Sequence, residues 1–396
     1  MSPSPLVCRE VRVTWHANGS VDEITYDGEP LIKAISNTLH TTQLTPQGAV
    51  LPLGFHRMIE NLLDSIASLS DARRKILLAD RVFGFKLNTG FPSPKLKRMV
   101  LEAILQTVWQ WEDSHEIVHK GTIYYFIANT YLEQGDIPSA YIYFFSAIEE
   151  DKHNFPVLQK SVKEGGAYLT TSLVDNPQTR PHLYSAVVVP LRNYLQTFIT
   201  EYNSRTATNL TMQEMDRKFL QADSLEDIKR FFVPTIHEIY HLSPLNSPRM
   251  INNDYSKLKV IDTLFNLSLI VDQILEYAFL RSAPREQRKM ANAVHRLALH
   301  SNWTTATRDR NAGLLLSRVQ PQLNSGPPDQ IVPCLLDGSA TFNGRSLGSQ
   351  KMAIFLAYHL RNFGGHHIKG QDVLVKRYPE VLSAILDAIF TAIEAL

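Results

Sequence analysis

Residues 121–150, "GTIYYFIANTYLEQGDIPSAYIYFFSAIEE", decide the fold class of this chain. Apolar residues recur there at three- and four-residue spacing on both sides of "QGDIP", a segment with the composition of a turn. They are Tyr124, Ile127, Ala128 and Tyr131 in the first half and Ala140, Phe144 and Ala147 in the second. The stretch therefore predicts two antiparallel helices joined by a short turn, and its small residues let the two backbones approach closely.

This pair of predicted helices resembles a tetratricopeptide repeat, which has small and aromatic residues at the same spacing. The resemblance implies a helical domain that binds a protein or ligand regulator. One unit is recognisable in the sequence, whereas an array needs about three to bury a continuous core. The alternative is an ordinary helical hairpin with alanine at the helix crossing.

The flanking segments predict a mainly helical chain that begins with β-structure. In "VRVTW", Val11, Val13 and Trp15 fall on one face of a strand, and the Asn-Gly pair of "HANG" predicts a hairpin turn into "DEITYDG". Three later segments have the apolar period of helices: "FHRMIENLLDSIASL", "LKRMVLEAILQTVWQW" and "LYSAVVVPLRNYLQTFITEY".

A break rich in Pro, Asn and Ser at residues 243–256 predicts a linker. Beyond it we expect four helices: "KLKVIDTLFNLSLIVDQILEYAFL", "PREQRKMANAVHRLALH", "QKMAIFLAYHLRN" and a last one that begins near Pro379. Between the second and third, residues 320–349 are rich in Pro, Gly, Ser and Asn and predict a long loop. The expected organisation is a β-hairpin segment at 1–50, a tetratricopeptide-like helical domain at 51–245 and a four-helix domain at 255–396.

The composition is that of an ordinary globular protein with a net charge of +1, which by itself indicates neither a nucleic acid nor a membrane partner. The charge is uneven, because residues 251–396 contain 16 Lys and Arg against 12 Asp and Glu. The two cysteines, Cys8 and Cys334, form no CxxC motif, and the first residues have no signal-peptide pattern. The absence of a disulfide framework predicts a protein of the reducing cytoplasm, and no apolar run reaches the ~18 residues of a membrane span.

A cationic and titratable segment follows the third of the four expected C-terminal helices, in "AYHLRNFGGHHIKG" at residues 357–370. Arg361 and Asn362 lie in the last turn of the helix, and the two glycines that follow end it. His366 and His367 come directly after the glycines. The pattern Arg361-Asn362-x-x-x-His366 resembles the R-N-x-x-x-H signature of the HEPN superfamily, whose four-helix domains include many metal-independent ribonucleases. The resemblance covers residues 255–396, about the C-terminal third, and implies a HEPN-like domain there.

These residue types suit the cleavage of RNA by its own 2′-hydroxyl group. Histidine transfers protons near neutral pH, and a guanidinium matches the charge that gathers on phosphoryl oxygens. Asn362 can position the phosphate or orient the imidazole, and neither a metal nor another cofactor is required. The alternative is a helix C-terminus whose cations simply interact with the helix dipole.

We therefore predict a metal-independent endoribonuclease that leaves 2′,3′-cyclic phosphate ends. His366 matches the family spacing for the proton carrier, and His367 fits a looser form of the motif. The residues expected to bind RNA are Arg285, Arg288, Lys289, Arg296 and Lys369. The resemblance also implies a role as a regulated toxin or antiviral defence effector, and a homodimer through the C-terminal domain with helix 350–360 near the interface.

A second motif, His237-Glu238-x-x-His241, has the spacing of a zinc metalloprotease. Pro234 and Pro244 are expected to limit its helix to about nine residues, and a third ligand would have to come from Asp262, Asp272 or Glu276. The protease is therefore the less favoured enzyme. The main alternative from another class is a non-catalytic helical scaffold or adaptor that binds a protein or nucleotide partner.

Overall fold

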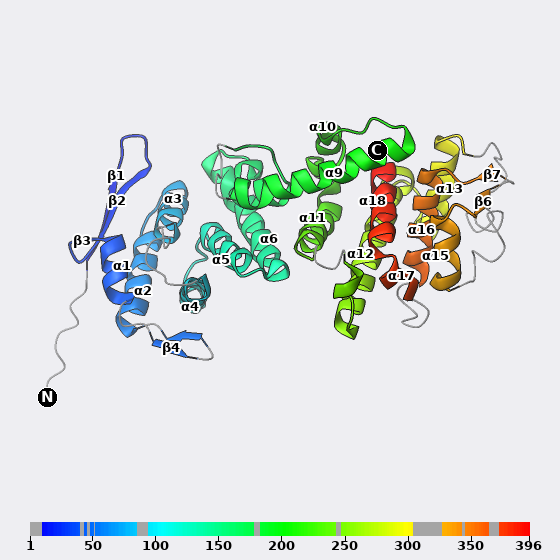
Figure 1. Cartoon of the computed structure of the whole chain (residues 1–396). Coiled ribbons are helices and arrows are strands. Elements are labelled where there is room, and N and C mark those ends of the chain that lie inside the picture. The colour runs from blue at the N-terminus through cyan, green and yellow to red at the C-terminus, as the bar shows by residue number, and fades with distance from the viewer. Residues whose placement is uncertain are drawn as a thin grey trace. The chain divides into compact units, whose positions relative to one another are not determined.

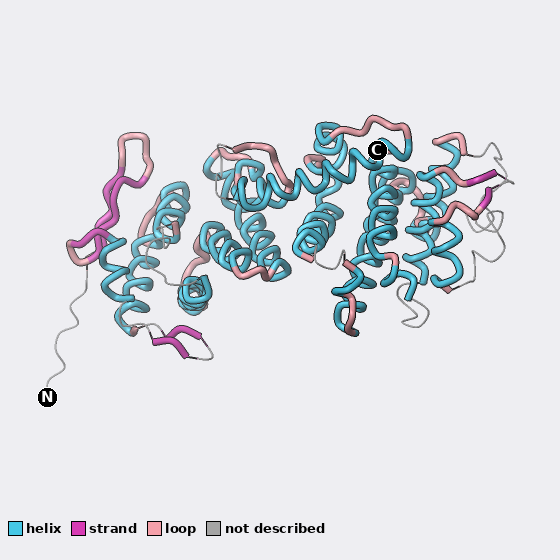
Figure 2. Tube along the Cα trace, viewed as in Figure 1, coloured by secondary structure: helices cyan, strands magenta, loops and turns pink. Residues whose placement is uncertain are grey.

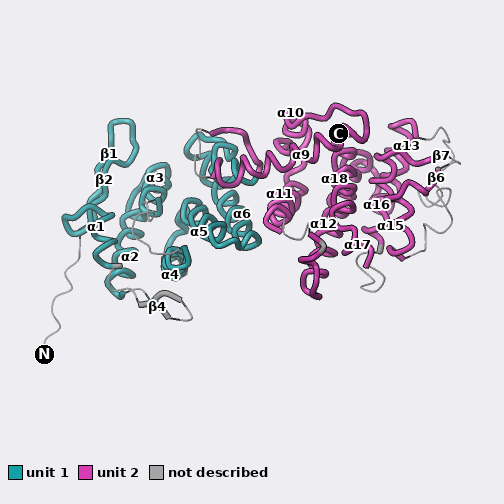
Figure 3. Tube along the Cα trace, in the orientation of Figure 1, with its two compact units in different colours: residues 1–171 teal, residues 172–396 magenta. Residues whose placement is uncertain are grey.

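A computed structural model describes residues 10–39, 43–45, 48–50, 52–84, 94–177, 183–242, 247–303, 327–342, 345–363 and 372–396. The chain is mainly helical and has a small antiparallel sheet near its N-terminus (Figures 1 and 2), which confirms the predicted class. It divides into two compact units, residues 1–171 and 172–396 (Figure 3). The expected assignment of segments to tetratricopeptide-like and HEPN-like domains stays a prediction.

Unit 1 begins with the predicted hairpin. Strand β1 (Val11–Trp15) pairs antiparallel with β2 (Val21–Tyr26), and Gly19 takes the positive φ of 81° that the Asn-Gly turn requires. A second turn at Asp27 and Gly28, also at positive φ, adds β3 (Glu29–Pro30), which the sequence did not predict. A separate two-stranded sheet consists of β4 (Gln43–Thr45) and β5 (Gly48–Val50).

The helices of unit 1 include the predicted helical hairpin. They are α1 (Leu31–Leu39), α2 (Leu53–Ala67), α3 (Ala72–Phe83), α4 (Pro94–Glu112), α5 (Gly121–Glu133), α6 (Ile137–Asn154) and α7 (Gly166–Thr171). Between α5 and α6, Gly135 has a φ of 76°, and the Asp136 carboxylate caps α6 by accepting a hydrogen bond from the backbone N–H of Ser139. Ala128 and Ala140 are fully buried, as expected for two closely packed helices.

Unit 2 is built around three helices that pack on one another, α12 (Asp254–Leu280), α16 (Ser349–Phe363) and α18 (Tyr378–Glu394). Around them lie α9 (Val189–Thr206), α10 (Met212–Met215), α11 (Glu226–His241), α13 (Met290–His300), α15 (Pro328–Leu336) and α17 (Asp372–Lys376). A short hairpin joins β6 (Thr341–Phe342) to β7 (Arg345–Ser346). The four helices predicted beyond the linker correspond to α12, α13, α16 and α18.

Three local predictions for unit 2 are wrong. Part of the expected loop at 320–349 is the helix α15, which begins with Pro328 at the first helical position, where its fixed φ fits. Helix α11 continues through Pro234, because Phe232, Val233 and Ile236 are buried on both sides of it.

The third correction concerns the basic residues before α13. This helix begins at Met290, and Arg285–Gln287 form a 3-10 turn. Arg285, Arg288 and Lys289 therefore lie in the connection that precedes α13, rather than on a helical face.

Candidate active site

Arg361 at the end of α16 is bound to Asp272 in the middle of α12. Its Nε donates a hydrogen bond of 2.9 Å to Asp272 Oδ2, and its Nη1 donates one of 3.1 Å to Asn362 Oδ1. The two helices pack against each other in unit 2. The contacts therefore hold the guanidinium in a defined orientation at a helix C-terminus, where the helix dipole also favours a cation.

The ion pair is buried on one side and open on the other. The Asp272 side chain is 7% exposed, whereas that of Arg361 is 39% exposed. Burial raises the pKa of Asp272, and the charge and hydrogen bond of Arg361 act against that rise. Asp272 thus works as a buried anchor, and part of the guanidinium remains accessible to an anion in solution.

The apolar face of α16 explains why Arg361 reaches this position. Ile354, Phe355, Leu356 and Leu360 are buried inside unit 2, where α16 packs on α12 and α18. The residue that follows Leu360 is consequently carried to the side of α12 that presents Asp272. Because residues 353–357 are buried on every side of the helix, a dimer contact near residues 350–360 would have to use the half-buried Gln350, Lys351, Met352 and Tyr358.

The two histidines of the motif, His366 and His367, lie outside the described residues, as does Lys369. The structure consequently places Arg361 and Asn362 together and adds Asp272, which the sequence suggested only as a metal ligand. No local signal identifies Asp272 as the partner of Arg361, because the two are 89 positions apart.

The remaining predicted RNA-binding residues gather where α12 leads into α13. Arg288 donates hydrogen bonds to the backbone carbonyls of Ala283 (3.0 Å) and Arg281 (2.9 Å), and Arg296 donates one of 2.6 Å to the carbonyl of Phe279. We name Arg281, Arg285, Arg288, Lys289 and Arg296 the basic cluster. Within the described part of the chain, none of these five side chains forms an ion pair with a carboxylate.

The His237-Glu238-x-x-His241 motif lies at the end of α11. His237 is buried, and burial together with the neighbouring His241 lowers its pKa to about 3. Glu238 forms an ion pair with Lys259 of α12. Among the residues that the structure describes, no group of three or more His, Cys, Asp and Glu side chains is arranged to hold a metal ion.

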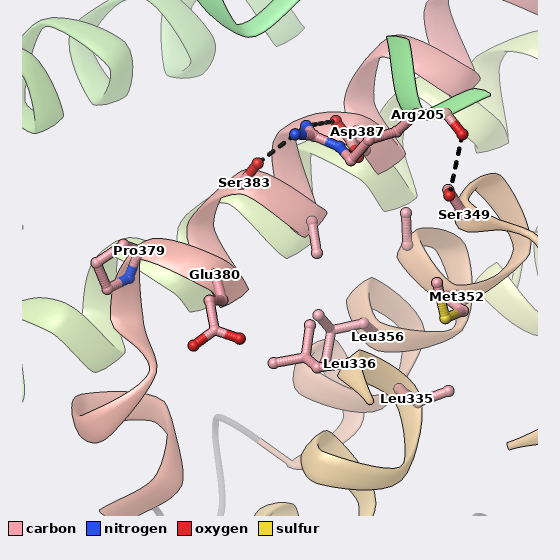
Figure 4. Close-up of a pocket in the computed structure, with 12 residues that line it drawn as sticks. Arg205, Leu335, Leu336, Ser349, Met352, Leu356, Pro379, Glu380, Ser383 and Asp387 are labelled. Carbon is pink, nitrogen blue, oxygen red and sulfur yellow. Dashed lines mark hydrogen bonds and ion pairs between the residues drawn. The ribbon is translucent and has the colours of Figure 1, made fainter. Parts of the chain in front are cut away.

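A pocket of about 400 Å³ opens between α9, α15, α16 and α18 (Figure 4). Its floor is apolar, with Leu335, Leu336 and Leu356, and its polar side is formed by Arg205 and Asp387. Arg205 donates to both oxygens of Asp387, at 2.9 and 2.7 Å, and also to Ser383 at 3.0 Å. The Arg205 guanidinium is 36% exposed beside an Asp387 that is 5% exposed, so this pair is similar in burial to Arg361 and Asp272, and it is the motif of Arg361 and Asn362 that sets the latter apart.

Unit 1 contains a buried charged cluster that the sequence did not indicate. The ring of His119 lies 3.3 Å from Asp80 Oδ1 and 3.6 Å from Glu150 Oε2. Burial alone lowers the pKa of His119, but the nearby carboxylates outweigh it and raise the pKa to about 9. Lys120 is also buried and donates to Glu112 at 2.7 Å. The cluster joins α3, α6 and the segment before α5, so its evident role is structural.

No family model, curated protein or solved structure matches this chain. Among the described helices, none combines the length and the apolarity that a membrane crossing requires.

Proposed function

We propose that unit 2 carries a metal-independent endoribonuclease site in which Arg361 stabilises the charge on the phosphoryl group. The single observation that supports this proposal most is the Arg361–Asp272 pair. A carboxylate that is 7% exposed fixes one edge of a guanidinium that is itself 39% exposed. Preorganised cations of this kind stabilise developing negative charge without having to reorient during the reaction.

In the proposed reaction, the 2′-oxygen of RNA attacks the adjacent phosphorus and the 5′-oxygen of the next nucleotide leaves. One proton is removed from the 2′-hydroxyl and one is delivered to the leaving oxygen, which produces a 2′,3′-cyclic phosphate and a 5′-hydroxyl. His366, or His367 in its place, is assigned to these proton transfers. Asn362, which already binds Nη1 of Arg361, would keep the guanidinium aligned with the phosphate.

The proposal includes the partners that the resemblance implies. A homodimer through unit 2 would supply a second Arg-His pair, since a single pair has few groups for base, acid and charge stabilisation together. Unit 1 would receive the protein or ligand that regulates the activity. The biological setting would be a toxin or an antiviral defence system.

A non-catalytic scaffold or adaptor is the second candidate, and one observation favours it. Among the described residues Arg361 has the partners Asp272 and Asn362, so its position is explained without any substrate. In that case the ion pair would only fasten α16 to α12.

Incubation of the full-length chain with mixed RNA, with and without a chelator, distinguishes the two candidates. The ribonuclease proposal predicts cleavage in both conditions and loss of cleavage when Arg361 is replaced. The scaffold predicts no cleavage in either condition.

A further inference from the structure

Arg296, one member of the basic cluster, and Arg361 both contact positions on one side of α12. Asp272, which holds Arg361, and Phe279, whose carbonyl binds Arg296, are seven residues apart. Seven residues make almost two full helical turns, so both positions share one face and are separated by about 10 Å along the axis. A strand of RNA at Arg361 would therefore reach the basic cluster within about three nucleotides, at about 3.4 Å for each stacked nucleotide.

The connection between α12 and α13, together with α13 itself, has the charge of a polyanion-binding surface. Residues 281–300 contain the five cations of the basic cluster and one carboxylate, Glu286. The hydrogen bonds of Arg288 and Arg296 go to backbone carbonyls, and neither side chain is paired with a carboxylate among the described residues. Arg281, Arg285 and Lys289 are exposed. Such a cluster attracts phosphates and releases their counterions on binding.

A pocket beside the cluster provides an independent observation. It has a volume of about 430 Å³ and is lined by Gln287, Asn292, His295 and Arg296, together with two leucines. His295 is 7% exposed, and its buried Nδ1 has no hydrogen-bond partner among the described residues. A buried polar atom without a partner costs free energy, and a ligand in the pocket is one way to provide that partner.

We infer that the basic cluster and this pocket bind the part of a single-stranded RNA that lies about three nucleotides from the bond at Arg361. The inference rests on the proposed function for the location of that bond. Glu276 lies on the same face of α12, between the levels of Asp272 and Phe279, and it raises the pKa of Asp272. Its carboxylate disfavours a phosphate at that level, so the strand contacts the protein mainly on either side of it.

Binding of a 12-nucleotide RNA in which every 2′-hydroxyl is methylated tests the inference, because this RNA lacks the attacking group. The variant Arg281→Gln/Arg285→Gln/Lys289→Gln removes three cations that make no hydrogen bond to a backbone carbonyl within the described residues. The matched control, Arg217→Gln/Arg249→Gln/Lys257→Gln, removes three cations elsewhere in unit 2. Equal melting temperatures exclude misfolding.

For the full-length chain we expect affinity to fall with salt, and the slope of log affinity against log salt to be about 2 units smaller in the cluster variant. Between 50 and 200 mM salt this difference amounts to about 15-fold. The control variant should retain the slope of the unmodified chain. A dinucleotide is too short to reach the cluster, so the substitutions in the cluster variant should slow its cleavage far less than the cleavage of an unmethylated 12-nucleotide RNA.

Equal slopes for the cluster variant and its control would overturn the inference, and so would the absence of any binding by the unmodified chain. If the slopes differ as expected but ordinary RNA stays intact, the proposed nuclease is wrong and the RNA-binding surface stands. If cleavage of the dinucleotide falls as much as cleavage of the unmethylated 12-nucleotide RNA in the cluster variant, the cluster acts at the bond itself and the three-nucleotide separation is wrong.

Discussion

Nε of Arg361 lies 2.9 Å from Oδ2 of Asp272, so the end of α16 is bound to the middle of α12. This one contact gives Arg361 two separable roles. It offsets part of the cost of burying the Asp272 carboxylate, and it orients the guanidinium for the proposed chemistry. Variants that separate stability from catalysis are therefore the most informative.

Replacing Arg361 by Gln alone should destabilise unit 2, because Asp272 is left buried without its cation. We expect a loss of about 2–4 kcal/mol in the free energy of unfolding, below the full cost of breaking a buried pair because Arg361 is partly exposed. The double variant Arg361→Gln/Asp272→Asn removes both charges and should recover most of that stability. Denaturant unfolding measures the difference, and equal stabilities of the single and double variants would show that the pair contributes little.

The activity of the same double variant should stay at least about 100-fold below that of the unmodified chain, because the stabilising charge is missing even though the fold is restored. Single-turnover cleavage of RNA checks this. Asp272→Asn alone is the control, since it keeps the guanidinium and a hydrogen-bond acceptor. A stable double variant with normal cleavage would remove Arg361 from the mechanism.

His366→Ala should reduce single-turnover cleavage by at least about 100-fold, as expected when a general acid–base group is removed. His367→Ala, at the neighbouring position, should cost no more than about 10-fold. The reverse order would assign the proton transfers to His367, and near-normal rates for both variants would show that the site lies elsewhere.

The stability of unit 1 should depend on pH through His119. Its pKa is raised from 6.5 to about 9, so the folded state binds the proton more tightly than the unfolded state. The resulting stabilisation is fully present below pH 6.5 and is lost as the pH rises through 9, by up to about 3 kcal/mol. Tryptophan fluorescence during denaturant unfolding reports mainly on this unit, because Trp15, Trp109 and Trp111 belong to it and Trp303 does not.

His119→Gln is the control for this pH dependence, because it removes the titrating group and keeps a hydrogen-bonding side chain. Its stability should change little between pH 6.5 and 9. If the unmodified chain has the same unfolding midpoint at pH 6.5 and at pH 9, His119 is not charged in the folded state.

The features that the sequence predicted well are local ones. The Asn-Gly turn before β2 and the three- and four-residue apolar spacing in α5, α6, α12 and α16 depend on residues close together in the chain. Helix α15 was missed because its proline-rich composition is typical of loops, although Pro328 is acceptable at a helix start.

The candidate site was predicted only in part, because sequence patterns report on residues that are close together in the chain. Arg361 and Asn362 are adjacent and belong to a short motif, whereas Asp272 and the carboxylates around His119 are brought in by packing between distant segments. A single sequence contains no signal that pairs such positions. A buried Asp or Glu that binds a distant cation has the same appearance in the sequence as one on an exposed helix.

Analysis of the RNA products by mass spectrometry in the presence of EDTA tests the central claim most directly. The full-length chain should produce fragments with 2′,3′-cyclic phosphate and 5′-hydroxyl ends, and the stable Arg361→Gln/Asp272→Asn variant should produce almost none. The account would be contradicted if the full-length chain leaves the RNA intact. It would also be contradicted by cleavage that is abolished by EDTA, restored by zinc and retained by the double variant.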